Sequence, residues 1–265
     1  MSSFLQRGLS GIIYVILFVS AILYSKYTYL ALVTVFAVFS LIEFQKLLKF
    51  KDIVSYLILA AFCFYAVLNE PIELLNQVLL VLVLFSSFQL TLFLFGKKEN
   101  YPTKFIEKLD LCVRYLVFSY GFIMLLPFID FMYQEMVILS LVIFIWTNDS
   151  FAYLIGKNFG KRKLFERVSP RKTIEGFVGG IIFTIVAAIV ISYYSDLFSL
   201  FHWIILSLIT SILGTVGDLV ESKFKRRAKV KDSGTIMPGH GGILDRLDSL
   251  LFVAPFVYLY IHFII

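Results

Sequence analysis

Nine apolar stretches recur along the chain, separated by short polar segments. A helix needs roughly 20 residues to cross the hydrocarbon core of a bilayer, and fewer where its flanking groups reach the interface. The pattern predicts an all-α, polytopic integral membrane protein with about nine transmembrane helices, forming one membrane domain over residues 1–265. The predicted spans are residues 9–24, 27–44, 53–68, 74–95, 111–129, 135–155, 174–194, 201–220 and 249–264.

Composition agrees with this pattern. Of the 265 residues, 60% are hydrophobic and 16% are charged, and the mean hydropathy is +0.89. An ordinary globular domain is about one quarter charged and about half apolar. Lipid must therefore solvate much of the surface, which excludes an ordinary water-soluble protein.

The positive charges fall on one side of the predicted spans. The formal net charge is +6, and with the N-terminus inside, every Lys and Arg except Lys26 lies on an inner segment. Inner loops of membrane proteins carry such an excess of Lys and Arg. We therefore expect a multi-pass protein of the cell (inner) membrane with a cytoplasmic N-terminus, in contact with membrane lipid and with no nucleic-acid partner.

The two halves of the chain differ in their polar content. Residues 1–145 hold apolar spans joined by simple Lys- and Glu-containing loops, and we interpret them mainly as scaffold. Residues 146–248 concentrate acids near span ends, glycines, and two basic loops predicted at 157–173 and 222–244. An ionisable residue within a span is costly, so it usually has a partner or a task. The catalytic segment is therefore predicted at 146–248.

Five carboxylates lie at the inner ends of three predicted spans. Asp149 ends the sixth span, Asp218 and Glu221 end the eighth, and Asp245 and Asp248 begin the ninth. The members of each pair are three residues apart, which places them on one helical face. Oxygen ligands of this kind suit a hard cation such as Mg²⁺, which binds one or two carboxylates together with substrate phosphates.

Ion pairing is the alternative explanation for these acids. Glu221 has Lys225 four residues later, and Asp245 precedes Arg246, so each acid has a base at hand. For Glu221, both interpretations stay open, as they do for Asp248. For Asp218, which lies deeper in its apolar stretch, metal binding is the favoured interpretation.

The predicted loop between the last two spans is basic and rich in glycine. Residues 222–227 carry four Lys and Arg residues, 231–234 read Lys-Asp-Ser-Gly, and 238–242 read Pro-Gly-His-Gly-Gly. Glycines permit backbone conformations in which successive N–H groups point at one anion. The pattern favours polyphosphate binding over simple anchoring to anionic lipid. His240 is either a phosphate contact or an ordinary hydrogen-bonding loop residue.

The preceding inner loop predicts a second anion site. Ser169 is followed by proline, so it could cap a helix whose first turn holds Lys172 and Thr173. A helix N-terminus binds anions well. The Gly176-x-x-x-Gly180 spacing just beyond it is typical of close helix packing.

These motifs resemble those of the phosphatidate cytidylyltransferase (CDP-diacylglycerol synthase) family. Residues 222–248 match its signature, including the rare Gly-His-Gly-Gly and Asp-Arg-x-Asp elements. Three upstream segments are also similar to family motifs: 148–153, 169–176 and 217–222. The first 140 residues match in hydropathy alone.

The resemblance implies transfer of the cytidylyl group of CTP to phosphatidate, giving CDP-diacylglycerol and pyrophosphate in phospholipid biosynthesis. It also implies a need for Mg²⁺, with a second cation left open, and a homodimer. The metal candidates are Asp218, Asp245, Asp248 and Glu221. The catalytic candidates are Asp218, Lys225, Arg226, Lys231, Asp232, His240, Asp245 and Arg246. The substrate-binding candidates are Asp149, Lys172, Thr173, Ser222, Gly239, Gly241 and Gly242.

Three other functions compete with this one. A CTP-dependent lipid-alcohol kinase would release CDP in place of pyrophosphate. A transporter of anionic solutes would also use acids within its spans, although it usually places them at the midplane between inverted repeats. A lipid-binding scaffold would explain the bases, but it has no need of paired aspartates.

Overall fold

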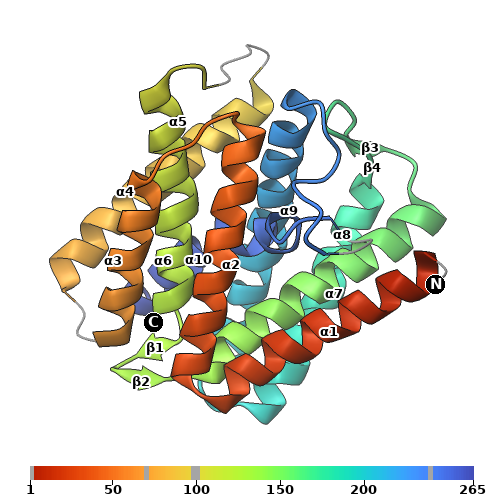
Figure 1. Ribbon diagram of the computed structural model, residues 1–265. Coiled ribbons are helices and arrows are strands. Elements are labelled where there is room, and N and C mark those ends of the chain that lie inside the picture. Colours follow the sequence, from red (N-terminus) through yellow and green to blue (C-terminus); the bar gives the residue numbers. More distant parts are fainter. Residues whose placement is uncertain (1–2, 69–71, 97–101, 238–240) are drawn as a thin grey trace.

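The computed structural model describes residues 3–68, 72–96, 102–237 and 241–265, which form a bundle of helices (Figure 1). For residues 3–7 and 9, only the backbone is described. The helices are α1 (Ser3–Tyr24), α2 (Lys26–Leu47), α3 (Val54–Leu68), α4 (Glu73–Phe95), α5 (Phe105–Leu111), the π-helical η1 (Cys112–Val117), α6 (Phe118–Leu125), α7 (Glu135–Phe159), α8 (Ile174–Tyr194), α9 (Leu200–Arg227) and α10 (Leu244–Phe263). The strands are β1 (Phe128–Ile129), β2 (Met132–Tyr133), β3 (Lys163–Phe165) and β4 (Ser169–Thr173).

The predicted all-α membrane fold is confirmed at this level. Five helices of the described chain, α2, α4, α7, α8 and α9, are long and apolar enough to cross a membrane. Large apolar side chains also point outward from the bundle, among them Phe64, Val81 and Phe88, each at least 60% exposed. An outward apolar surface is what a lipid-solvated bundle requires. The number of nine crossings stays a prediction.

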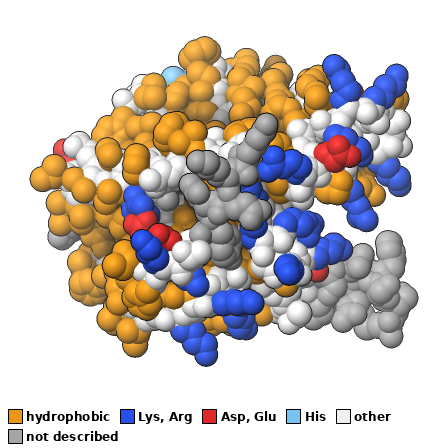
Figure 2. All heavy atoms as spheres, turned by 90° about the horizontal axis from the view of Figure 1, so that it is seen from above, with side chains coloured by type: hydrophobic (Ala, Val, Ile, Leu, Met, Phe, Trp, Pro, Cys, Tyr) orange, Lys and Arg blue, Asp and Glu red, His pale blue; other side chains and the backbone are white. Residues whose placement is uncertain are grey.

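The bundle has two different ends. The α2–α3 connection, the β3–β4 hairpin and the α9–α10 connection lie at the upper end in Figure 1, whereas the β1–β2 hairpin and the α8–α9 connection lie at the lower end. Figure 2 views the upper end, where Lys and Arg side chains gather while apolar side chains cover the flanks. This separation agrees with the predicted one-sided distribution of charge. The orientation in the membrane stays a prediction.

Helix α9 is longer than the apolar pattern predicts. Its predicted span ends at residue 220, but the helix continues to Arg227, so residues 222–227 are helical and not part of a loop. Hydropathy marks where a helix leaves the lipid, and these polar residues form helix readily. Three bases in the last turn, Lys225, Arg226 and Arg227, also complement the negative end of the helix dipole. The side chains of 218–227 are therefore held on one rigid element.

Glycines bring α8 against α7, as the Gly176-x-x-x-Gly180 spacing predicts. A Cβ on Gly176 would lie 3.1 Å from the Cα of Gly156, and one on Gly180 would lie 2.9 Å from the carbonyl oxygen of Asn148. Real Cβ atoms rarely approach so closely. The absence of side chains thus lets the two helices touch through their backbones, which places the N-terminus of α8 beside the polar end of α7.

We expect Gly180→Val to separate these helices. The added side chain would overlap Asn148, so the folded protein should lose about 1–3 kcal/mol of stability and unfold at a lower temperature in detergent. The matched control is Val178→Leu, because Val178 is on the same helix and 47% exposed. Equal unfolding temperatures for the two variants would show that the close approach is unimportant.

Candidate functional site

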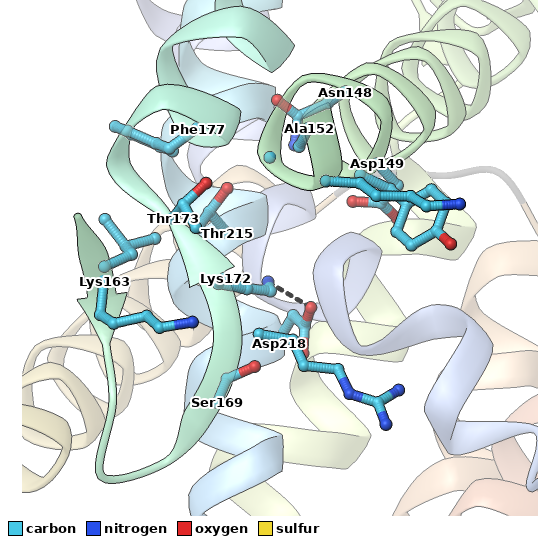
Figure 3. Close-up of a pocket in the computed structure, with 15 residues that line it drawn as sticks. Asn148, Asp149, Ala152, Lys163, Ser169, Lys172, Thr173, Phe177, Thr215 and Asp218 are labelled. Carbon is cyan, nitrogen blue, oxygen red and sulfur yellow. Dashed lines mark ion pairs between the residues drawn. The ribbon is translucent and has the colours of Figure 1, made fainter. Parts of the chain in front are cut away.

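A cavity of about 520 Å³ opens at the basic end of the bundle, between α7, the β3–β4 hairpin, α8 and α9 (Figure 3). It combines acidic and basic walls. The charged residues that line it are Asp149, Lys157, Lys163, Arg171, Lys172 and Asp218. Apolar groups, including Leu164 and Phe177, complete the lining. A hollow with this excess of bases suits a polyanionic ligand that also carries an apolar part.

An ion pair between Lys172 and Asp218 crosses the cavity (Figure 3). Each side chain is 28% exposed, and the hydroxyl of Ser222 donates to Asp218 Oδ1 at 3.2 Å. Burial lowers the pKa of Lys172, but the adjacent Asp218 carboxylate outweighs it, so this pKa lies above its ordinary value. Lys172 therefore stays cationic at neutral pH. The structure thus brings together three residues from two motifs that lie far apart in the sequence.

The hairpin positions Lys172 differently from the predicted helix cap. Residues Ser169–Thr173 form β4, which pairs with β3, and α8 begins only at Ile174. Thr173 is the N-cap, and its hydroxyl accepts a hydrogen bond from the Gly176 amide at 3.1 Å. The prediction that Ser169 caps this helix is wrong, because residues 169–173 form an extended strand and Thr173 at its end is the N-cap. Lys172 still lies beside the N-terminus of α8.

Glu175 fixes the base of this hairpin. Its carboxylate accepts hydrogen bonds from the backbone amides of Lys161 at 3.0 Å and Arg162 at 3.1 Å. The side chain of Arg162 adds a contact of 3.3 Å. An acidic residue in the first turn of α8 thus ties the chain that leaves α7 to the helix that follows the hairpin. The β3–β4 hairpin, which forms the basic wall of the cavity, is therefore anchored to the start of α8.

A second network of charges surrounds Lys225 on α9. Its ammonium group donates to Glu221 at 3.1 Å and to Asp245 at 2.6 Å. The side chains of all three residues are at most 9% exposed. Glu221 therefore forms the ion pair with Lys225 that its spacing suggested. Asp245 pairs with the same Lys225, which lies on the neighbouring helix α9.

Asp245 is also hydrogen bonded to the loop that precedes α10. Its Oδ2 atom accepts from the Ser233 amide at 2.8 Å, the Ser233 hydroxyl at 2.9 Å and the Gly242 amide at 2.8 Å. Gly241 adopts φ +91°, a backbone conformation that favours glycine. A Cβ there would lie 2.6 Å from Asp245. The described end of the glycine-rich loop is thus folded around a protein carboxylate.

Four carboxylates on three helices, α7, α9 and α10, interact electrostatically with one another. Asp248 interacts with both Asp218 and Glu221, and Asp149 interacts with Asp218. Glu221 is fully buried, and its carboxyl group is in hydrogen-bonding contact with that of Asp248. Hard oxygen donors of this kind are compatible with a divalent cation.

The metal site itself stays a prediction. Among residues 3–68, 72–96, 102–237 and 241–265, no three His, Cys, Asp or Glu side chains are close enough together to enclose an ion. Mg²⁺ usually keeps several waters and few protein ligands. The donor set therefore fits a cation that is held by one or two carboxylates and a bound phosphate.

Glu43 is a site residue that the sequence analysis missed. It lies on α2, is 1% exposed, and accepts hydrogen bonds from the amides of Ile243 at 3.2 Å and Leu244 at 2.9 Å. The Ser233 hydroxyl adds a third contact of 3.0 Å. An acid inside the predicted span 27–44 was a sufficient signal, because an ionisable residue within a span needs a partner.

The remaining candidates lie around this core. Arg226 is exposed, and its guanidinium donates to the carbonyl oxygen of Val230 at 3.0 Å. Lys231 and Asp232 are exposed on the loop, and Arg246 interacts with Asp149. Gly239 and His240 lie outside the described residues.

The known proteins that this chain resembles are cytidylyltransferases. The sequence profile of the cytidylyltransferase family matches residues 5–264. A phosphatidate cytidylyltransferase of Bacillus subtilis (strain 168) is 52% identical over 115 residues, which cover 43% of each chain. One of Staphylococcus aureus (strain COL) is 52% identical over 120 residues, covering 44% of this chain and 46% of that protein. The chain thus matches less than half the length of these curated relatives.

Proposed function

This chain belongs to the cytidylyltransferase family, and we propose that it transfers the cytidylyl group of CTP to phosphatidate, giving CDP-diacylglycerol and pyrophosphate. The observation that carries the proposal is the cavity in which Lys172 pairs with Asp218 among three further bases. It opens at the basic end of an apolar bundle. A soluble triphosphate and a lipid phosphate can meet at such a boundary.

The proposed reaction depends more on neutralising the charges of its two substrates than on a general base. The second pKa of a phosphate monoester is about 6, so phosphatidate is largely dianionic at neutral pH. One of its oxygens attacks the α-phosphorus of CTP, the bond from that phosphorus to the β-phosphate oxygen breaks, and pyrophosphate leaves in line. Two strongly anionic groups must approach each other. The protein therefore has to position them and neutralise their charge.

The bases of the cavity are arranged for this task. Lys157, Lys163 and Arg171 line its wall together with Lys172 and would hold the triphosphate. When bound, Mg²⁺ supplies further neutralisation of the phosphates. Asp218, with Asp248 or Glu221, would hold it, since Asp248 interacts with both of the others and carboxylate oxygens suit a hard cation. Asp245 would support them by fixing Lys225.

The membrane arrangement follows from the same proposal. Phosphatidate remains in the leaflet while CTP arrives from the cytosol, so the basic end would face the cytoplasm, with nine spans and the N-terminus inside. The one-sided placement of Lys and Arg supports this orientation. A homodimer in the inner membrane is the assembly that the family resemblance favours.

The direct test uses the full-length protein in detergent with phosphatidate, Mg²⁺ and CTP labelled on its α-phosphate. We expect label in CDP-diacylglycerol, with one pyrophosphate released per lipid. Release of CDP with a lipid alcohol as acceptor would identify a kinase instead. Uptake of an anion by proteoliposomes without turnover of CTP would identify a transporter. Either result would overturn the proposal.

The cavity wall makes a separate prediction about CTP. Lys163→Met should raise the KM for CTP about two- to five-fold, the range expected of one exposed charge, with kcat nearly unchanged. High salt should shrink the difference, because ions screen exposed charges. Arg167→Met is the matched control, since Arg167 is on the turn of the same hairpin but does not line the cavity. An equal rise in KM for both variants would contradict the assignment of the cavity.

A further inference from the structure

Glu43 reaches the functional site from the half of the chain that carries no family motif. It is a buried acid on α2 that contacts both the loop and the start of α10. We propose that Glu43 is a positioning residue for the cytidylyl transfer, fixing Ser233 and residues 242–244 and, through them, Asp245 and Lys225. This inference rests on the proposed function.

The first contact orients α10. Oε1 of Glu43 accepts from the amide of Ile243 and Oε2 from the amide of Leu244, two N–H groups that have no partner within the helix. An acid at this end of a helix is also favoured by the helix dipole. Because α10 begins here, the direction of its first turn depends on the Glu43 carboxylate. That turn carries Asp245, and the next carries Asp248.

The second contact links Glu43 to the charges around Lys225. The Ser233 hydroxyl lies 3.0 Å from Glu43 Oε2 and 2.9 Å from Asp245 Oδ2. The other oxygen of Asp245 accepts from Lys225 at 2.6 Å. A continuous set of short polar contacts therefore runs from α2 through the loop and α10 to α9.

The fit around Glu43 leaves little room for movement. A Cβ on Gly234 would lie 2.7 Å from the Glu43 carboxyl carbon, and one on Gly242 would lie 2.6 Å from it. The loop is thus packed directly on the carboxylate. Glu43 does not line the cavity, and its negative charge would repel a phosphate, so it acts through the groups that it holds.

The test is Glu43→Gln in the full-length protein. Both carboxylate oxygens accept from backbone amides, so the NH₂ group of glutamine must face an N–H donor. We expect faster hydrogen exchange at the amides of 242–244. We also expect kcat to fall by about 10²-fold, as a small misplacement of reacting groups can produce, with the KM for CTP within about two-fold of wild type.

Ser40→Ala is the matched control. Ser40 is buried on the same helix and hydrogen bonded to the Tyr120 hydroxyl at 2.6 Å, so its loss should lower the unfolding temperature without changing exchange at 242–244 or kcat. If the Glu43 variant cannot be purified, Gly234→Ala tests the same contact from the loop. Its added methyl group would overlap Glu43, and we expect the same rise in exchange and fall in kcat.

The two readouts separate this inference from the function on which it rests. Wild-type protein that makes no CDP-diacylglycerol would overturn the proposed function, while the exchange experiment would still test the contact. Unchanged exchange and kcat in Glu43→Gln or Gly234→Ala would overturn the positioning role. It would also be overturned if Ser40→Ala lost as much kcat as Glu43→Gln at a similar unfolding temperature, since general destabilisation would then explain both.

Discussion

Replacing Asp218 with asparagine should lower the kcat of the proposed CDP-diacylglycerol formation by about 10²- to 10³-fold, the loss typical of removing one preorganised electrostatic group. Asp218 pairs with Lys172 in the cavity and lies beside Asp149 and Asp248. An amide keeps the shape of this side chain but loses its charge, so neither Lys172 nor a bound cation would be held as before. The measurement is turnover at saturating CTP and Mg²⁺.

Asp196→Asn is the control for this variant. Asp196 is exposed on the α8–α9 connection at the opposite end of the bundle, so its variant should turn over at the wild-type rate. The Asp218 variant should remain folded, because its side chain is 28% exposed. A wild-type kcat in Asp218→Asn would show that this carboxylate is not needed for the reaction. The charges around Lys225 would then be the remaining candidates.

Replacing Lys225 with methionine should destabilise the fold strongly. The ammonium group lies between Glu221 and Asp245, and all three side chains are nearly inaccessible to solvent. Removing one member of a buried ion pair typically costs about 3–5 kcal/mol, because it leaves an uncompensated buried charge. We expect this loss in the free energy of unfolding, measured in mixed detergent micelles.

Two further variants identify the cause of that loss. Arg226→Met removes a neighbouring positive charge that is exposed and donates to one carbonyl oxygen, so it should cost about 1 kcal/mol. Combining Lys225→Met with Glu221→Gln should recover part of the stability by removing one unpaired carboxylate. A similar loss in the Lys225 and Arg226 variants would contradict a buried ion network.

Several features of the site could be predicted from local sequence. Helix periodicity places Asp218 and Glu221 on one face, and the same spacing applies to Asp245 and Asp248. Each pair is found within the helix expected for it. The ion pair of Lys172 with Asp218 could not be predicted, because it joins residues from separate elements, β4 and α9.

Other features depend on contacts that a local pattern does not encode. Strands β3 and β4 are three and five residues long and lack an alternation of apolar residues. They form because each satisfies the other's hydrogen bonds, and the link from Lys161 and Arg162 to Glu175 closes their base. The partners of Glu43, unlike its need for a partner, could not be predicted for a related reason. Its partners lie about 200 positions away in the chain, and only the folded bundle brings them together.

The length of α9 sets the depth at which chemistry can occur. A helix of 28 residues is about 42 Å long at 1.5 Å per residue, whereas the hydrocarbon core is about 30 Å thick. If the helix crosses the bilayer, roughly its last two turns therefore reach the layer of phosphate and glycerol groups. Lys225 lies in that stretch, and Asp218 lies just below it. In the proposed reaction, phosphatidate could then present its phosphate to the site while both of its acyl chains stay in the leaflet, so the protein would not need to lift the lipid into water.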